Sequence, residues 1–595
     1  MEQNKGLDKN QLISFFIFSM LLVGALFYFQ NKDQKNEKEQ NKTVQSNQNK
    51  SPNQAQNHAV VANPALSQTA IENINLKNDE LNLQFSTLGG QITSVELEKY
   101  KAYNAKTDNA DLQLYLFNKN NSSYGFQFKD KSGKIIQTKD LVFTPTVQGN
   151  SITLSTNING ASLEFIYTLL PKYTVDFKIK SNGLSQITAD NQADFVWDYS
   201  VRNLEKGRSQ EEQHTEFGYA FDHYSSYDYD GRTTMDESKE TLNWLAIKQQ
   251  FFTAVVEPKT GFTQSKGNQE VIPEGEYLKK FSFDGKVSMQ GSELNQDFSW
   301  YFMPLDLDML KSYQGKDFDK ILPLGWSFIG WLNRYFFIPV YDFIGTWGLS
   351  AGWVIFMLTI IVKLITSPIM YKQHKLSAMM RVIRPEIDEV NSKYKDGDAM
   401  KKQQATMEVY RKAGVNQMAG CLPALIQIPI FYALFRLFPN LIGLRGESFW
   451  FVKDLTAYDD VIKWTTSIPL IGNHISIFAL ACTIVILIYT IMTSGQMQQP
   501  TQEGMPNMKV LMYIFPVTFF FFLNSAPSGL SWYYFISNAI NILIILVIKY
   551  WILDEKKIHA QIQANKAQPK KEGKFQKKMR EMMEQAQEQQ KNSKK

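Results

Sequence analysis

A lysine stands in the middle of the apolar run FMLTIIVKLITSPIM, which covers residues 356–370. A charged side chain at the centre of a hydrocarbon layer costs about 2.5–3.5 kcal/mol, and such residues usually mark a functional pathway. Thr359 and Ser367 lie about one helical turn before and after Lys363, so the three share one helix face. The chemistry open to this face is the capture of an anionic group by an ammonium ion.

Three uses of Lys363 are open at this point. Its side chain could extend along the helix to a membrane surface, it could activate Ser367 in an intramembrane hydrolase, or it could line a water-filled groove. Eight residues separate it from the end of the run near Tyr371, about 12 Å at 1.5 Å per residue, which is further than a lysine reaches. Ser367 precedes Pro368, which fits a helix kink better than an activated nucleophile. The sequence therefore favours the groove.

Other apolar runs carry polar residues that could line the same groove. Gln427 stands between two prolines in the run 419–438, and Asn538 follows Tyr533 and Tyr534 in the last run. Polar side chains in membrane spans usually face the bundle or water. No Asp or Glu occurs near mid-depth in any of these runs. The counter-charge of the lysine is therefore expected to arrive with a substrate, as an acidic group on a translocating chain.

Several classes of enzyme lack their defining residues. The sequence has no HExxH, CxxC, GxSxG or Walker A motif, and its 6 histidines show no metal-binding spacing. Its 2 cysteines, Cys421 and Cys482, both lie in apolar runs and fit small buried side chains. We expect no enzyme activity, no metal and no cofactor.

The chain alternates between polar and apolar parts that predict a membrane protein. An uncleaved signal-anchor helix is expected at 1–30, since nothing small follows its apolar run, and a flexible linker at 31–74. A core of five further spans is expected within 347–552. The five span candidates are 349–371, 419–438, 475–492, 508–523 and 529–551.

The loop charges orient these six spans. The segment 372–418 contains 10 Lys and Arg residues and the tail after residue 550 contains 12, whereas 439–474 contains 3. Because positive loops remain in the cytoplasm, both termini are predicted to be cytoplasmic. The polar part at 75–320 is then outside, which in a bacterium is the periplasm. Its short alternating segments, such as YTVDFKIK at 173–180, predict an all-β domain.

Three smaller elements complete the organisation. Residues 321–346 combine aromatics with Asn333, Arg334 and Asp342, which favours an amphipathic helix in the membrane interface. Residues 374–413 read as a cytoplasmic helical hairpin in which Pro385 kinks or restarts the first arm and Gly414 ends the second. The tail at 553–595 is basic and suits either solvent or contact with anionic lipid or ribosomal RNA.

Three separated motifs resemble the YidC family of membrane protein insertases, relatives of the Oxa and Alb proteins. They are IIVKLITSPIMYKQHKLSAMMRVIRPEIDEV, VYRKAGVNQMAGCLPALIQIPIFYALF and APSGLSWYYFISNAINI, in this order over about 320–550. STLGGQITSVELEKY at 86–100 further resembles the Gram-negative form, whose periplasmic domain is a β-supersandwich.

The resemblance implies a protein of the bacterial inner membrane that inserts and helps fold newly made membrane proteins, alone or with the Sec translocon. It implies a five-helix groove in which a positive residue, usually arginine and here Lys363, receives the polar tail of the incoming protein. Lysine retains the charge but lacks the bidentate guanidinium. The implied partners are nascent membrane proteins, the Sec translocon, the lipid bilayer and, through the tail and cytoplasmic loops, the ribosome; DNA is not expected. The expected site residues are Lys363, Thr359, Ser367, Gln427, Tyr533, Tyr534 and Asn538 in the groove, with Arg381, Arg384 and Pro385 in the hairpin.

Two other readings of the residues remain. A small-solute or ion transporter with a lysine gate would need an outside path and a counter-carboxylate. A passive scaffold that holds partners by its β domain would leave Lys363 without a role.

Overall fold

The computed structural model describes residues 74–118, 121–231, 233–325, 327–394, 399–415, 422–494, 508–552 and 554–567. The predicted signal anchor, most of the linker and the end of the tail lie outside these residues. The described chain forms two compact units. The β unit comprises residues 74–325 with Arg436–Tyr458, and the helical unit comprises Ser327–Phe435 with residues 459–567.

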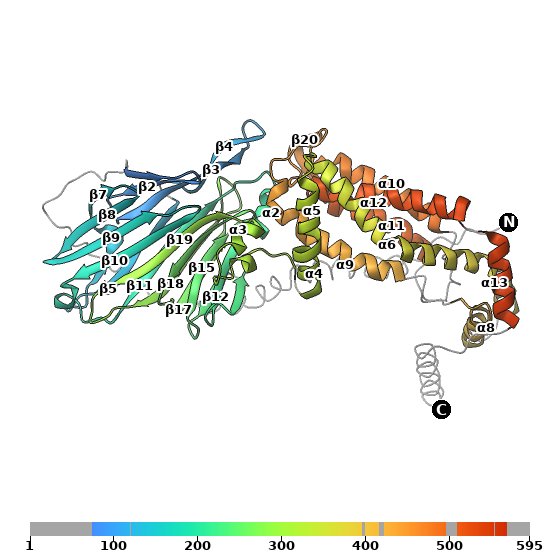
Figure 1. The fold of residues 1–595 in the computed structure, drawn as a ribbon, viewed down its shortest axis with the longest axis horizontal. Coiled ribbons are helices and arrows are strands. Elements are labelled where there is room, and N and C mark those ends of the chain that lie inside the picture. Colours follow the sequence, from blue (N-terminus) through green and yellow to red (C-terminus); the bar gives the residue numbers. More distant parts are fainter. Residues whose placement is uncertain are drawn as a thin grey trace, which may run out of the picture. The chain divides into compact units, whose positions relative to one another are not determined.

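The β unit contains three antiparallel sheets (Figure 1). The largest has nine strands in the order β13 (Ser226–Asp230), β12 (Glu216–Phe221), β15 (Leu242–Lys248), β16 (Phe252–Pro258), β19 (Gln296–Pro304), β10 (Thr174–Asn182), β9 (Ala161–Leu169), β8 (Ser151–Ile158) and β7 (Thr144–Gln148). The second has six, in the order β14 (Thr234–Glu237), β17 (Thr263–Val271), β18 (Tyr277–Ser288), β11 (Gln192–Arg202), β5 (Ser122–Lys129) and β6 (Ile135–Gln137). The third has four, β1 (Ile74–Lys77), β2 (Leu81–Ser86), β3 (Gln91–Asn104) and β4 (Asn109–Asn118). Two short helices, α2 (Arg208–Gln213) and α3 (Leu307–Lys311), lie between strands of this unit.

The two larger sheets pack face to face through aromatic side chains. Along β11 buried residues alternate with partly exposed ones, as a strand with one buried face requires. Trp197 of β11 contacts Trp300 of β19 with ring centroids 5.0 Å apart, and Phe195 contacts Phe298 at 5.8 Å. The alternation that predicted an all-β domain thus reflects a buried face on each sheet, and Trp197 belongs to the core.

A segment that the sequence assigned to the helical core belongs to the β unit. Residues Arg436–Tyr458 follow the second predicted span, yet Gln250 donates to the carbonyl of Pro439 at 2.8 Å. Arg445 forms an ion pair with Glu205 at 2.8 Å, and both side chains are only 9% exposed. Its guanidinium also donates to the carbonyl of Lys101 at 2.6 Å. The segment is therefore held to the β unit by buried polar contacts.

The helical unit contains ten helices in the described residues. Their bounds are α4 (Ser327–Leu332), α5 (Ile338–Gly345), α6 (Ala351–Val382), α7 (Arg384–Lys393), α8 (Ala399–Lys412), α9 (Leu422–Leu437), α10 (Ile477–Ser494), α11 (Met508–Asn524), α12 (Ser528–Val547) and α13 (Glu555–Ala567). A two-stranded hairpin, β20 (Ile462–Ile468) and β21 (Gly472–Ile475), precedes α10. In the described residues two helices are long and apolar enough to cross a membrane, Ala351–Val382 and Ser528–Trp551, and Ile477–Thr493 and Met512–Asn524 are shorter apolar helices.

Helices α4 and α5 form the amphipathic element expected at 321–346. A π-helical turn, Asn333–Phe337, joins them. Figure 1 shows them upright, across the direction of α6, α10 and α12. The side chains of Phe328, Trp331, Tyr335 and Phe343 are exposed, whereas Asn333 is fully buried and donates to the carbonyl of Ala433 in α9 at 2.8 Å.

Candidate functional site

Lys363 lies on the inner face of α6. Residues at intervals of four along this face, Ile355, Thr359 and Lys363, are 0%, 0% and 4% exposed. Its neighbours Leu364 and Ile365 are 66% and 58% exposed on the opposite face. Because apolar side chains point outward and the lysine points inward, the helix packs its one charged mid-span residue among the other helices.

Within the described part of the chain the ammonium of Lys363 has neither a hydrogen bond nor an ion pair. The apolar helices α6 (up to residue 371), α9, α10, α11 and α12 contain no Asp or Glu in their sequences, so no carboxylate stands ready beside it. A buried charge without a partner is costly. This arrangement suits a cation whose anion is brought by another molecule.

The two hydroxyls beside Lys363 bond to their own helix. Thr359 donates to the carbonyl of Ile355 at 2.7 Å, and Ser367 donates to the carbonyl of Leu364 at 2.8 Å. Ser367 is half-buried. A nucleophilic serine must offer its proton to a base, and this one offers it to a backbone carbonyl instead. The observed geometry gives no support to a Ser–Lys hydrolase.

Helix α12 carries the two tyrosines of the predicted groove. Tyr534 is 4% exposed and donates to the carbonyl of Phe431 in α9 at 3.1 Å. Its ring lies 5.2 Å from that of Phe431 and 6.0 Å from that of Phe519 in α11. Tyr533 is fully buried, and Asn538 donates to the carbonyl of Tyr534 within its own helix at 2.8 Å. Tyr534 thus joins α9, α11 and α12.

Gln427 lies on α9 one turn before Phe431 and is half-buried. Helix α12 also reaches α6, because the indole of Trp532 donates to the carbonyl of Gly352 at 2.9 Å. The helices that carry Lys363, Gln427 and the tyrosines are therefore tied to one another through α12. Trp532 was not among the predicted site residues, and the only signal for it in the sequence is its place beside the two tyrosines.

The cytoplasmic hairpin predicted at 374–413 consists of the end of α6 with α7 and α8. Pro385 restarts the first arm, since α6 ends at Val382 and α7 begins at Arg384, and Gly414 (φ +70°) follows the end of α8. Both features were predicted. Arg381 and Arg384 are exposed, and Nε of Arg384 lies 3.8 Å from Oδ2 of Asp388.

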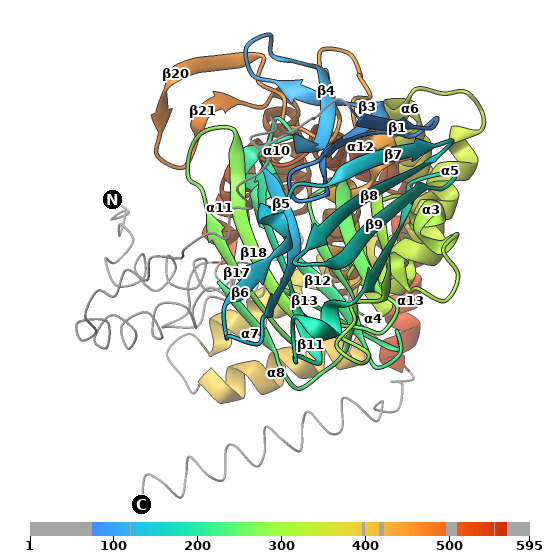
Figure 2. The same ribbon diagram turned by 90° about the vertical axis from the view of Figure 1, so that its left-hand side faces the viewer.

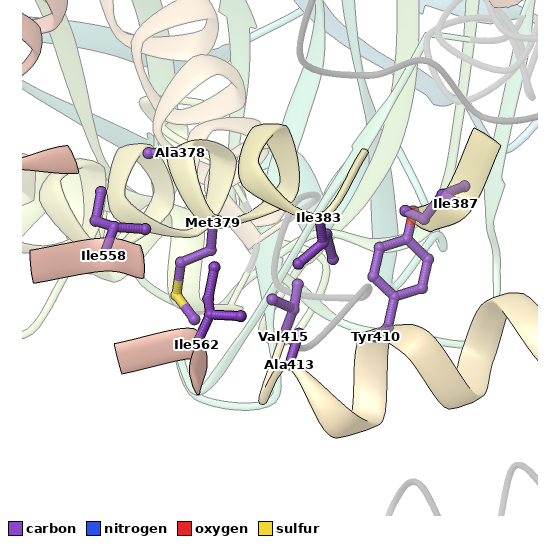
Figure 3. Close-up of a cluster of buried hydrophobic side chains, with 9 residues drawn as sticks. All are labelled: Ala378, Met379, Ile383, Ile387, Tyr410, Ala413, Val415, Ile558 and Ile562. Carbon is purple, nitrogen blue, oxygen red and sulfur yellow. The ribbon is translucent and has the colours of Figure 1, made fainter. Parts of the chain in front are cut away.

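The start of the basic tail covers the hairpin. Helix α13 packs on it, and nine residues from the three segments form one buried apolar cluster (Figure 3). Ile558 and Ile562 of α13 are 3% and 2% exposed in this cluster. Asn565 donates to the carbonyl of Ala413 at 2.9 Å. The first part of the basic tail is therefore folded.

Comparison with known proteins decides the family. The family model described as the 60Kd inner membrane protein matches residues 340–557, and that of the YidC periplasmic domain matches residues 73–339. A membrane protein insertase YidC of Parabacteroides distasonis is 38% identical over 532 residues, which are 85% of this chain and 82% of the relative. The chain belongs to the YidC family of membrane protein insertases. Its helical part and β unit are thus the inner-membrane and periplasmic parts of the family.

Another curated relative is similar over most of its length. The YidC insertase of Phocaeicola vulgatus is 35% identical over 577 residues, 91% of each chain. Among solved structures, an active YidC insertase with its first transmembrane domain resolved covers 81% of this chain and 94% of that one, at 19% identity and a TM-score of 0.32. YidC membership gives the chain the function of a membrane insertase.

Proposed function

We propose that the chain inserts newly made proteins into the inner membrane through a hydrophilic groove centred on Lys363, and that it acts alone or with the Sec translocon. The observation that carries this proposal is the inward-facing, buried lysine without a carboxylate in the apolar helices. A short acidic segment of an incoming chain would supply the missing charge. Thr359, Gln427 and the two tyrosines of α12 supply the remaining polar wall, with Ser367 and Asn538 beside it.

The insertion step requires no covalent chemistry. A positive, wet groove lowers the cost of moving a short polar segment partway across the bilayer, since ion–ion attraction strengthens where the dielectric constant is low. The apolar helix of the substrate then passes into lipid. Its burial, worth about 25 cal/mol per Å2 of apolar surface, drives the step.

The topology in the proposal has six spans. They are the signal anchor, α6, α9, α10, α11 and α12, with both termini in the cytoplasm and the β unit in the periplasm. The support is the count of positive residues, 10 in 372–418 and 12 after residue 550 against 3 in 439–474. Helices α4 and α5 then lie in the outer interface with their aromatic face toward lipid.

The cytoplasmic partners in the proposal are nascent chains and the ribosome. The hairpin and α13 present a compact basic module, in which Arg381 and Arg384 are exposed and Lys566 bonds to Glu386 at 2.5 Å. The exposed basic side chains of this module, together with the basic residues of the tail, suit ribosomal RNA, which binds basic side chains with release of counterions.

The experiment replaces Lys363 by Arg, Met or Glu in cells depleted of the native protein. The substrate is a single-span protein with a short acidic translocated tail. We expect Arg to support insertion, Met to weaken it and Glu to weaken it further, because only the first retains the positive charge. The matched control is Leu364→Glu, which adds the same carboxylate one residue away on the outward face. Full insertion by Lys363→Glu would rule out electrostatic capture.

A further inference from the structure

The β20–β21 hairpin is an amphipathic element with an exposed apolar tip. Its first strand reads IKWTTSI, in which Ile462, Trp464 and Ile468 are the apolar residues, and its pairing with β21 shifts register between Lys463 and Ile468. Ile462 and Ile468 are 46% and 43% exposed. At the tip, Leu470 is 84% exposed and has a left-handed backbone (φ +70°), a conformation that turns normally give to Gly or Asn.

The base of this hairpin is fixed rigidly to the core helices. Asn524, the last residue of α11, donates to the carbonyls of Ile471 and His474 at 2.9 and 3.0 Å and accepts from the backbone N–H of Ser476 at 2.9 Å. Asp459, just before β20, accepts from the hydroxyl of Ser476 and the N–H of Ile477 at 2.5 Å each. The exposed tip therefore extends from an ordered base.

The hairpin sits at the end of the core that also carries the aromatic face of α4 and α5. The starts of α6 and α12 meet there through Trp532 and Gly352, and α11 ends there at Asn524. Figure 1 shows β20 and α5 at this same end of the core helices. Figure 2 looks along those helices and shows β20 and β21 extending sideways from them. The hairpin and the α4–α5 pair thus lie across the direction of the core helices, at the same end of them.

One residue, Ser476, separates β21 from α10, whose outward face is a stripe of exposed apolar side chains. Leu480, Ile484, Ile488 and Ile491 recur at helical spacing and are 41–60% exposed. In a membrane protein such a stripe faces lipid. The hairpin, with its exposed Ile462, Ile468 and Leu470, leads directly into this helix.

We propose that the β20–β21 hairpin is a lipid-binding element, which lies in the outer interface of the inner membrane with Leu470, Ile468 and Ile462 among the upper acyl chains. The occupant is the bilayer because the hairpin leads directly into α10, whose exposed apolar stripe faces lipid, and lies at the end of the core that carries the α4–α5 aromatics. The inference goes beyond insertion itself and needs only that α10 and α11 cross the membrane.

The test uses the full chain in vesicles of phosphatidylethanolamine and phosphatidylglycerol. With Cys421 and Cys482 changed to Ser, a single cysteine at 470 carries an environment-sensitive fluorophore. The matched controls carry it at Ser467, a polar residue of β20, and at Lys453, an exposed residue of the β unit. We expect a blue-shifted emission at 470 and quenching by nitroxides on the upper acyl chain several-fold stronger than at 453, with 467 in between.

A second variant tests whether the fluorophore at 470 enters the bilayer by its own hydrophobicity. With the label moved to Ile462, the substitution Leu470→Asp should reduce lipid quenching, because the tip would leave the acyl region. Quenching at 470 by aqueous iodide but not by lipid nitroxides would overturn the proposal. Protection of the label at 470 from both quenchers would show that protein covers the tip, and would overturn the proposal equally. Insertion by each labelled chain is measured in the same vesicles, so failure here is distinct from failure of the groove mechanism.

Discussion

The ion pair that holds the segment 436–458 offers the most quantitative prediction for the β unit. Replacing Arg445 by Ala leaves Glu205 buried, 7% exposed, without its cation. The guanidinium also covers the ring of Phe252 at 5.0 Å, so a packing contact is lost too. Removing one partner of a buried pair costs about 3–5 kcal/mol. Burial raises the pKa of Glu205, and the charge of Arg445 opposes that rise.

Hydrogen exchange of the full chain in detergent measures this cost locally. Since about 1.4 kcal/mol corresponds to a tenfold change, amides of Arg436–Tyr458 and β16 should exchange roughly a hundred- to several-thousand-fold faster in Arg445→Ala. The increase should shrink at lower pH, because a protonated Glu205 needs no cation.

The control is the double variant Arg445→Met with Glu205→Leu, which removes both charges. It should exchange more slowly than Arg445→Ala, since no buried charge is left unpaired. Equal exchange in Arg445→Ala and the unmodified chain would refute the reasoning. Equal exchange in the single and double variants would show that packing, not charge, holds the segment.

Three further predictions concern other parts of the chain. Burial, with smaller effects of Lys248 and Arg436, lowers the pKa of His214 to about 3. The β unit should therefore lose up to about 1.4 kcal/mol of stability per pH unit as the pH falls below 6.5. Hydrogen exchange should show this loss in the unmodified chain and not in His214→Gln. Asp459→Ala should reduce the stability of the start of α10 by about 0.5–2 kcal/mol, because Asp459 accepts hydrogen bonds from the first backbone N–H groups of that helix. Amides of the first turn should then exchange faster, whereas Asp460→Ala should have little effect. Ile562→Asn should release α13 and make the tail sensitive to protease, whereas the same change at the exposed Gln563 should not.

Local sequence rules predicted the elements that depend on neighbours in sequence. The alternating segment at 173–180 predicted β10, because that strand buries one face. Pro385 and Gly414 predicted helix boundaries, because their backbone limits act within one turn. Lys363 stood out because a charge in an apolar run is costly wherever the run packs.

Contacts between distant residues escaped the same rules. The pairing of Arg445 with Glu205 spans 240 positions, so nothing local to 436–458 marked it as part of the β unit. The tail looked solvated because α13 buries only the few apolar residues that its sequence contains, such as Ile558 and Ile562. The β20–β21 hairpin was not predicted, because its base is fixed by a side chain of another helix.

Photo-crosslinking inside the proposed groove asks most simply whether the nascent chain passes Lys363. A crosslinking amino acid replaces Ser367, which lies one turn from Lys363 on the same helix face, so the lysine is retained. Ribosomes stalled during synthesis of a single-span substrate are then added. We expect a crosslink from 367 to the polar segment of the nascent chain, and much less from position 364, which faces outward on the same helix. Equal crosslinks from 367 and 364, or none from 367 while insertion proceeds, would contradict the groove mechanism.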